Sequence, residues 1–156
     1  MKIGILGGSF DPAHKGHLAI SKEAKKRFKL EKIIWAVTKK NPLKAESKTP
    51  ISKKIKDCKK VIGLNSFIKV KFYENIIKSN KTIDLINYLK KNKNIEIFFL
   101  MGADNLINFH KWYKSELISQ KCNIIVFDRH GYKKNSLKSN QCHQQVSTHY
   151  FLCLLF

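Results

Sequence analysis

Five short apolar runs, separated by longer segments, constrain the fold of this chain more than any other feature of its sequence. Each run has five to seven residues, which is the usual length of a strand in a globular protein. Four of them are almost continuously apolar, as expected for strands covered on both faces, and the third alternates. The runs are Lys2–Leu6, Ile33–Val37, Phe67–Phe72, Ile95–Met101 and Asn123–Phe127.

Helical patterning fills three of the intervals between these runs. Apolar residues recur every four positions from Gly16 to Phe28, Ser52–Ile62 is a lysine-rich helical segment that Gly63 ends, and Thr82 is placed to cap a third helix. Strands that alternate with helices predict right-handed βαβ units and a doubly wound α/β fold with a parallel sheet. Ligands bind such sheets at the carboxyl ends of the strands, so the functional site is expected at that edge. Its candidate segments follow four of the strands: residues 7–17, 38–44, 102–104 and Arg129.

The size and composition of the chain favour one compact domain. The chain has 156 residues, of which 43% are hydrophobic, and this is enough for a single core. No apolar run approaches the roughly 20 residues of a membrane-spanning helix. The four cysteines have no metal-type spacing, and no secretory leader is apparent. These features predict a cytoplasmic protein without a membrane partner.

The net charge of +20 raises the alternative of a nucleic-acid-binding module. Only Arg27 and Arg129 are arginines among the 31 basic residues, whereas base readout favours the bidentate guanidinium group. Lysine, asparagine and isoleucine are abundant together, which is what an A+T-rich genome encodes at tolerant surface positions. We therefore interpret the charge mainly as solvated surface that attracts anionic small molecules, without a specific nucleic-acid partner.

The stretch GGSFDPAHKGH, residues 7–17, joins the first predicted strand to the first predicted helix. Gly7 and Gly8 let the backbone turn sharply and bring N–H groups close to a ligand, and the following helix points its positive end at the same place. This predicts an anion site, with a tight turn that binds no ligand as the alternative. His14 and His17 stand three residues apart, so their imidazoles can reach one group together. Such a pair suits the stabilisation of charge on a transferred phosphoryl or nucleotidyl group.

This stretch resembles the signature of the nucleotidyltransferase superfamily that carries an H-x-G-H motif. Further pieces, in matching order over about residues 1–133, are similar to those of the nicotinate-nucleotide adenylyltransferase family. They are NPLK at 41–44, YENIIKSNKTIDLINYL at 73–89, FLMGADNLINFHKWY at 99–113 and IIVFDRHGY at 124–132. The resemblance implies a Rossmann-like nucleotidyltransferase fold. It also implies adenylyl transfer from ATP to nicotinate mononucleotide in NAD biosynthesis, which yields deamido-NAD and pyrophosphate.

The resemblance implies roles for individual residues as well. His14, His17 and Lys44 are expected to act on the phosphates during catalysis. Trp112 is expected to stack on the nicotinate ring, whose carboxylate receives backbone N–H groups of Thr82 and Tyr113. Mg²⁺ is expected to bind through the substrate phosphates and water, without protein ligands. The residues expected to bind ATP are Gly7, Gly8, Ser9, Phe10, Gly16, Gly102, Asp104 and Arg129.

Four of these residues also have a structural interpretation. Asp104 directly follows the fourth strand, where it is placed either to accept hydrogen bonds from a ribose or to cap a helix. Trp112 lies in an aromatic-rich segment and suits a packed position, Lys44 resembles any surface lysine, and Arg129 stands at a strand end where arginines are often structural. At Lys44 and Trp112 only the resemblance favours the functional role. Asp104 and Arg129 also follow strands at the carboxyl edge of the sheet, and Asp104 can combine both roles.

The last eighteen residues differ in character from the rest of the chain. Ser139–Phe156 contains no Asp, Glu, Lys or Arg, although 27% of the whole chain is charged. A helix-opening motif of the type I-S-S-T-x-I-R, which the resemblance implies for binding ATP phosphates, is missing. We expect a nucleotidyltransferase domain at 1–138 and an atypical tail at 139–156 that is read out of frame or unrelated to the family. An apolar tail that packs on the sheet is the alternative, and the incomplete phosphate site predicts weak activity and self-association.

Other functions stay open at this point. Phosphopantetheine adenylyltransferases and cytidylyltransferases share the two histidines but not the GADNL and HKWY matches. A non-catalytic nucleic-acid-binding module would account for the charge alone. Pyrophosphate release that requires nicotinate mononucleotide would favour the adenylyltransferase, whereas salt-dependent retention on DNA without ATP turnover would favour the module.

Overall fold

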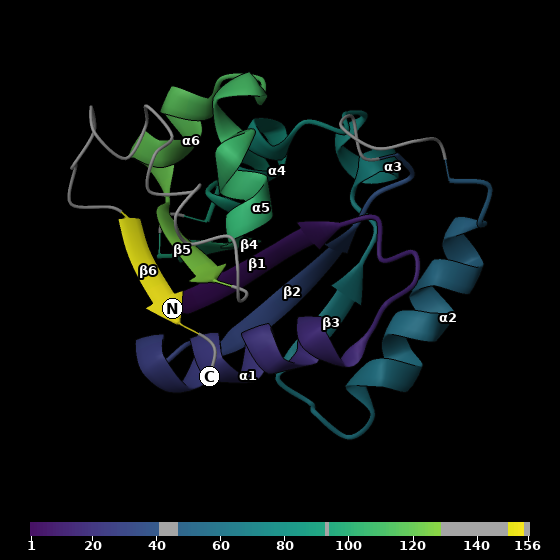
Figure 1. Cartoon of the computed structure of the whole chain (residues 1–156). Coiled ribbons are helices and arrows are strands. Elements are labelled where there is room, and N and C mark those ends of the chain that lie inside the picture. Colours follow the sequence, from purple (N-terminus) through teal and green to yellow (C-terminus); the bar gives the residue numbers. More distant parts are fainter. Residues whose placement is uncertain (41–46, 93, 129–149, 155–156) are drawn as a thin grey trace.

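The computed structural model describes residues 1–40, 47–92, 94–128 and 150–154, with only the backbone described at 128 and 150–154. These residues build one parallel sheet of six strands in the order β3-β2-β1-β4-β5-β6 (Figure 1). The strands are β1 (Lys2–Gly8), β2 (Lys32–Val37), β3 (Ile68–Lys71), β4 (Glu96–Gly102), β5 (Asn123–Asp128) and β6 (Tyr150–Leu154). The doubly wound α/β fold and the five predicted strands are confirmed.

The sixth strand was not predicted. β6 pairs in parallel with β5 along residues 124–128 and 150–154 and forms one edge of the sheet. Its local pattern is a short apolar run, which the sequence alone does not distinguish from an apolar tail packed on the sheet. Residues 139–149 lie outside the described residues. That the tail is unrelated to the rest of the family stays a prediction.

Helices cover both faces of the sheet (Figure 1). One face carries α1 (Lys15–Phe28) and α2 (Ile51–Ile62), whose apolar residues pack with the strands around the fully buried Trp35. The other face carries α4 (Thr82–Leu89), α5 (Ala103–Ile107) and α6 (Ser115–Lys121). Short elements complete the chain: α3 (Glu74–Ile77) and the 3-10 helix η1 (Phe109–Lys111). Among the described residues, no helix combines the length and the apolar character needed to cross a membrane.

The observed ends of two helices agree with the prediction from the sequence to within one residue, and the start of a third differs from it. α2 contains the predicted segment Ser52–Ile62 and ends at Gly63, whose φ of 56° suits a residue without a Cβ. α1 begins one residue before the predicted Gly16. The cap of α4 is Lys81, without a side-chain cap bond, and Thr82 is the first helical residue. The expectation that Thr82 caps this helix is therefore wrong, because its backbone has already entered the helix.

The chain reverses its direction of winding across the sheet between β1 and β4. It proceeds from β1 to β2 and β3 on one side and then crosses to β4, β5 and β6 on the other. The carboxyl ends of β1, β2 and β4 lie side by side there, with Gly8 paired to Val37 and Leu6 paired to Leu100. Loops diverge at such a switch point and leave a crevice between them.

Candidate active site

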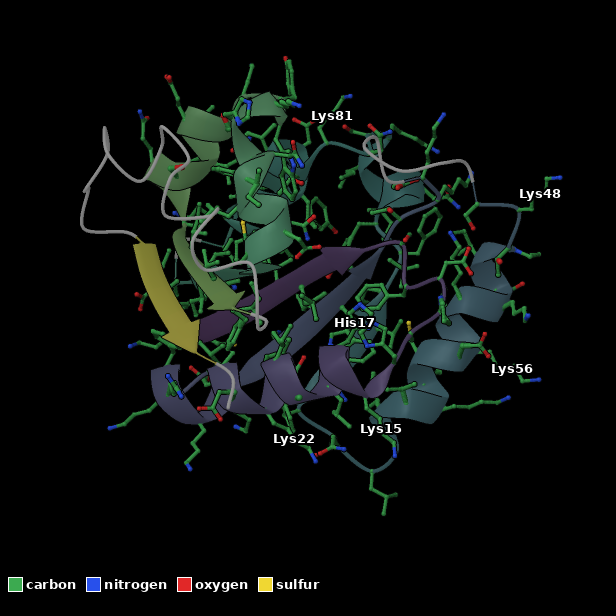
Figure 2. The ribbon with its side chains drawn as sticks, viewed as in Figure 1. Lys15, His17, Lys22, Lys48, Lys56 and Lys81 are labelled. Carbon is green, nitrogen blue, oxygen red and sulfur yellow. The ribbon has the colours of Figure 1, made fainter. Side chains whose placement is uncertain are left out.

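The turn after β1 brings the two predicted histidines together at the start of α1. We call residues 9–17 the histidine corner, and Figure 2 labels His17 within it. His14 is the N-cap of the helix, and its Nδ1 accepts a hydrogen bond from the Gly16 N–H at 3.1 Å. The His14 N–H donates to His17 Nδ1 at 3.2 Å, and the two ring centroids are 3.9 Å apart. Because both Nδ1 atoms accept backbone protons, each neutral ring carries its own proton on Nε2 and can donate from there.

A buried aromatic pair, Phe10 of the histidine corner and Trp35 of β2, packs beneath His17. Phe10 is 3% exposed, adopts a left-handed φ of 47°, and stacks on Trp35 of β2 with ring centroids 5.0 Å apart. The same Phe10 ring lies 4.8 Å from the His17 ring. Trp35 Nε1 donates to Ser21 Oγ at 2.8 Å, and Ser21 Oγ donates to the His17 carbonyl at 2.9 Å. The position of His17 is therefore set by the core as well as by the helix.

A cavity of about 330 Å³ opens at the carboxyl edge of the sheet; we call it the edge cavity. Five residues predicted for the site line it together: Gly7 and Gly8 at the end of β1, Thr82 at the start of α4, and Trp112 and Tyr113 after η1. Its other lining residues are Thr38 and Lys40, from the candidate segment 38–44, and six residues that were not predicted: Asn80, Lys81, Phe99, Asn105, Lys111 and Ile118. The two glycines connect the edge cavity to the histidine corner along the chain.

The aromatic residues of the edge cavity are held differently from each other. Trp112 is half-buried and meets Phe99 of β4 edge to face, with centroids 5.8 Å apart and planes at 87°. It also contacts Phe109 at 5.4 Å, so two core rings fix its orientation. Tyr113 is 54% exposed, and the Nζ atoms of Lys81 and Lys114 lie 5.9 and 5.2 Å from its ring centroid. Trp112 thus belongs to the wall of the edge cavity and Tyr113 to its rim.

Three lysines, Lys40, Lys81 and Lys111, line the edge cavity, and no Asp or Glu is among the described residues that do so. A concave surface with one sign of charge concentrates ligands of the opposite sign. The sequence places Lys40 in the candidate segment 38–44, but it does not single out Lys81 and Lys111, although these directly precede Thr82 and Trp112. Proximity to a predicted site residue could have pointed to them, but in a chain with so many lysines nothing in the local sequence selects these in particular.

The remaining predicted residues are placed as follows. Gly102 ends β4 and is the N-cap of α5, without a side-chain cap bond, and Asp104 is in the first turn of that short helix. The alternative in which Asp104 caps the helix is therefore wrong. Neither of them lines the edge cavity, whereas their neighbour Asn105 does. Ser9 is half-buried in the turn after β1. Lys44 and Arg129 lie outside the described residues.

Two carboxyl groups beside the site and two thiol groups in the core have shifted pKa values. Hydrogen bonds from Ser47 and Thr49, with Lys54 and Lys53 nearby, lower the pKa of Asp11 in the histidine corner. Burial raises the pKa of Glu74 in α3, against the smaller effects of its bond to the Lys39 N–H and of nearby lysines. Burial raises the pKa of the free thiols of Cys58 and Cys122 to about 12. These two cysteines stay protonated near neutral pH and are poor nucleophiles.

Fold and site together define the class of protein. A doubly wound parallel sheet, a glycine turn that leads into paired histidines, and a lysine-lined cavity at the carboxyl edge are the features of a nucleotide-binding α/β protein. A family model described as cytidylyltransferase-like matches residues 5–152.

Relatives and solved structures narrow this class. A probable nicotinate-nucleotide adenylyltransferase of Pelagibacter ubique is 69% identical over 138 residues, which are 88% of this chain and 77% of the relative. One from a Bradyrhizobium species is 37% identical over 83% of this chain and 68% of its own length. The chain belongs to the cytidylyltransferase-like family and, within it, to the nicotinate-nucleotide adenylyltransferases.

The fold itself is similar to a solved structure of low sequence identity. Plasmodium falciparum nicotinic acid mononucleotide adenylyltransferase complexed with NaAD superposes with a TM-score of 0.78 at 21% identity, covering 99% of this chain and 75% of the other. A second structure of that enzyme, complexed with APC, gives a TM-score of 0.76. At this identity the likeness shows the Rossmann-like nucleotidyltransferase fold.

Proposed function

We propose that this adenylyltransferase carries out its reaction across the histidine corner and the edge cavity. An oxygen of the nicotinate mononucleotide phosphate attacks the α-phosphorus of ATP. The bond from that phosphorus to the bridging oxygen of the β-phosphate breaks, which gives deamido-NAD and pyrophosphate. This reaction needs two anionic substrates held in line and no covalent enzyme intermediate. The observation that carries the proposal is the meeting of five predicted residues in one cavity beside the paired histidines.

In this proposal the histidine corner binds the triphosphate of ATP. His14 and His17 can donate from Nε2 to phosphate oxygens, and Gly7 and Gly8 let the phosphates approach the backbone closely. The N–H groups at the start of α1 give this end of the helix a partial positive charge. No acidic residue in the first turn of α1 offsets that charge. Phe10 is buried on Trp35 and would contribute through its backbone. Ser9, Gly16, Gly102 and Asp104 are proposed to complete the ATP site, as are Lys44 and Arg129.

The edge cavity binds the mononucleotide in this proposal. Trp112 supplies an aromatic wall for the pyridine ring, held in place by Phe99 and Phe109. The N–H of Thr82 is in the first turn of α4 and has no partner within the helix, so it can donate to the ring carboxylate. Lys81 and Lys111 provide positive charge for the same substrate, and the N–H of Tyr113 at the rim is proposed as a second donor.

Mg²⁺ is proposed to act as the cofactor through the substrate phosphates. The described residues include no group of three or more His, Cys, Asp or Glu side chains that could hold a metal ion. An ion that bridges phosphate oxygens and water needs no such group, and the donors of the histidine corner suit the remaining phosphate oxygens. When bound, the ion would neutralise charge on the departing pyrophosphate.

The test is a two-substrate assay on the purified chain with ATP and Mg²⁺. Pyrophosphate release and deamido-NAD formation are measured with nicotinate mononucleotide, with its amide counterpart, with phosphopantetheine, and without any acceptor. We expect release that requires the nicotinate form and is lost in a His14→Ala/His17→Ala double variant prepared identically. Release with phosphopantetheine alone would assign another nucleotidyltransferase activity. No turnover with salt-dependent retention on DNA would favour a nucleic-acid-binding module.

Two further expectations belong to this proposal. The protein is proposed to work in the cytoplasm, where ATP is available, and to self-associate, since residues 139–156 contain no charged side chain. Light scattering after size exclusion, measured over a range of protein concentrations, tests the second: a mass of 18.1 kDa at every concentration would contradict it.

A further inference from the structure

One lysine is buried in the core, whereas the other lysines of the same helix are not. Lys54 of α2 is 1% exposed and is the one charged residue among the buried side chains of the described part of the chain. Lys53, Lys56, Lys59 and Lys60 on the same helix are exposed, and Figure 2 shows Lys56 pointing outward from α2. Removing an ammonium group from water is costly unless its donors are satisfied, so the partners of Lys54 are informative.

The partners of Lys54 belong to the segment that follows β2. Its Nζ donates to the Lys39 carbonyl at 3.1 Å and to the Thr38 carbonyl at 3.4 Å. The next residue in the segment is Lys40, and both Thr38 and Lys40 line the edge cavity. A side chain of α2 thus holds the backbone whose side chains form one wall of the proposed mononucleotide site.

A carboxylate from another loop of the same edge binds the segment that Lys54 holds. The Glu74 carboxylate of α3 accepts the Lys39 N–H at 3.2 Å, so residue 39 is held from both sides. The pKa of Glu74 is raised overall by burial, and the positive charge of Lys54 acts in the opposite direction as a smaller effect. The segment after β2 is therefore held by Lys54 of α2 on one side and by Glu74 of α3 on the other.

We propose that Lys54 is a positioning residue for adenylyl transfer, because its buried ammonium group fixes the Thr38–Lys40 backbone against the Glu74 carboxylate and so sets the wall of the edge cavity. The inference rests on the proposed function of that cavity. Lys54 does not line the edge cavity itself, so it acts through the segment it holds. Misplacement of a binding group by about 1 Å is enough to lower a rate by as much as 10²-fold. Loss of the Lys54 ammonium group should therefore weaken substrate binding although Lys54 does not contact the edge cavity.

The primary test compares Lys54→Met with Lys56→Met, which removes the same charge from the exposed face of the same helix. We expect Lys54→Met to raise KM for nicotinate mononucleotide at least ~10-fold and KM for ATP by less, with Lys56→Met within about twofold of the unmodified chain for both. A lysine needed only for folding would lower the melting temperature and the active fraction, and therefore kcat, while KM of the folded molecules stays unchanged. That outcome would overturn the proposal.

Two more variants keep the proposal testable if Lys54→Met folds poorly. Lys54→Arg keeps a charged group with several donors for the two carbonyls, and we expect it to restore KM to within about threefold. Glu74→Ala removes the partner of the Lys39 N–H from a half-buried position, and we expect it to raise the same KM. In the Lys54→Met/Glu74→Ala double variant, KM should rise by less than the product of the two single-variant increases, because both side chains hold the same segment.

The outcomes separate this inference from the proposed function. If the unmodified chain forms no deamido-NAD, the proposed function fails. If the chain is active and Lys54→Met and Glu74→Ala each behave like Lys56→Met, the site assignment stands and the positioning role is wrong. Multiplicative effects in the double variant would likewise contradict a shared segment.

Discussion

The histidine corner and the edge cavity lie at the same edge of the sheet but are assembled in different ways. The histidine corner is local: His14, Gly16 and His17 bond to one another within four residues of chain. The edge cavity combines the ends of β1 and β2, the start of α4, and Trp112, which is more than seventy residues from Thr38 in the chain. A local arrangement depends on its own residues and a few supports beneath them, whereas the cavity depends on every loop being in place.

Because the two regions are assembled differently, variants in them should lose activity in different ways. Removal of a histidine deletes a group that is proposed to touch the reacting phosphates, so the chemical step should slow. Removal of a cavity residue deletes binding surface for one substrate only, so its KM should rise. The following experiments are arranged to test this separation.

The largest effect is expected in the histidine corner. His17→Ala and His14→Ala should each lower kcat at least ~10²-fold with the fold intact, because charge stabilisation at a transferred phosphoryl group contributes several kcal/mol. Steady-state kinetics with far-UV circular dichroism measures both. His14→Asn keeps an oxygen that can cap α1, so it should be as inactive as His14→Ala but about 1 kcal/mol more stable. Lys22→Ala, at an exposed position of α1 outside the histidine corner, is the control, and near-normal rates in both histidine-to-alanine variants would contradict the site assignment.

The second effect is expected at the cavity wall. Trp112→Ala should raise KM for nicotinate mononucleotide about 10-fold while KM for ATP changes less than about twofold, because the ring contacts one substrate. Trp112→Phe keeps an aromatic face and should lie between these values. Equal changes for both substrates would show that Trp112 only packs against Phe99 and Phe109, and the proposed separation of the two regions would be lost.

The third effect concerns the support beneath the histidines. Trp35→Phe removes the indole N–H that donates to Ser21 and leaves space in the core, so the free energy of unfolding should fall by about 1 to 3 kcal/mol. Below the melting temperature, kcat should fall much less than in the histidine variants. Urea denaturation and kinetics at one temperature measure the two quantities. A loss of kcat as large as that of His17→Ala, without loss of stability, would mean that the histidine corner is less local than its bonds indicate.

The smallest effect is a pair of pH dependences with opposite signs. The pKa of Asp11 is lowered from 3.8, so its stabilisation is present above that pH and is lost as pH falls through the folded value. The pKa of Glu74 is raised from 4.5, so its contribution is present below that pH and is lost as pH rises through the folded value. The melting temperature should therefore depend less on pH than in the unmodified chain, at the acid end for Asp11→Asn and above pH 4.5 for Glu74→Gln. Parallel curves for both variants and the unmodified chain would contradict the shifts.

Much of the scaffold was determined by the sequence itself. Runs such as Ile33–Val37 and Ile95–Met101 are apolar because both faces of a central parallel strand are covered, and this requirement is visible without knowledge of the neighbours. The close approach of the His14 and His17 rings was also predictable, because residues three apart at the start of a helix lie on the same side of it. Strand β6 was missed, because nothing in its local pattern distinguishes an edge strand from a packed apolar tail.

Tertiary structure alone decided which of the many lysines matter. Lys54 and Lys56 are two residues apart and chemically identical, yet one is buried on the carbonyls of Thr38 and Lys39 and the other faces solvent. Lys40, Lys81 and Lys111 meet in the edge cavity only because three strand ends bring their loops together. Periodicity and motif spacing act over a few residues of chain, whereas the environment of a charge is set by segments far apart in sequence, and that arrangement exists only in the folded sheet.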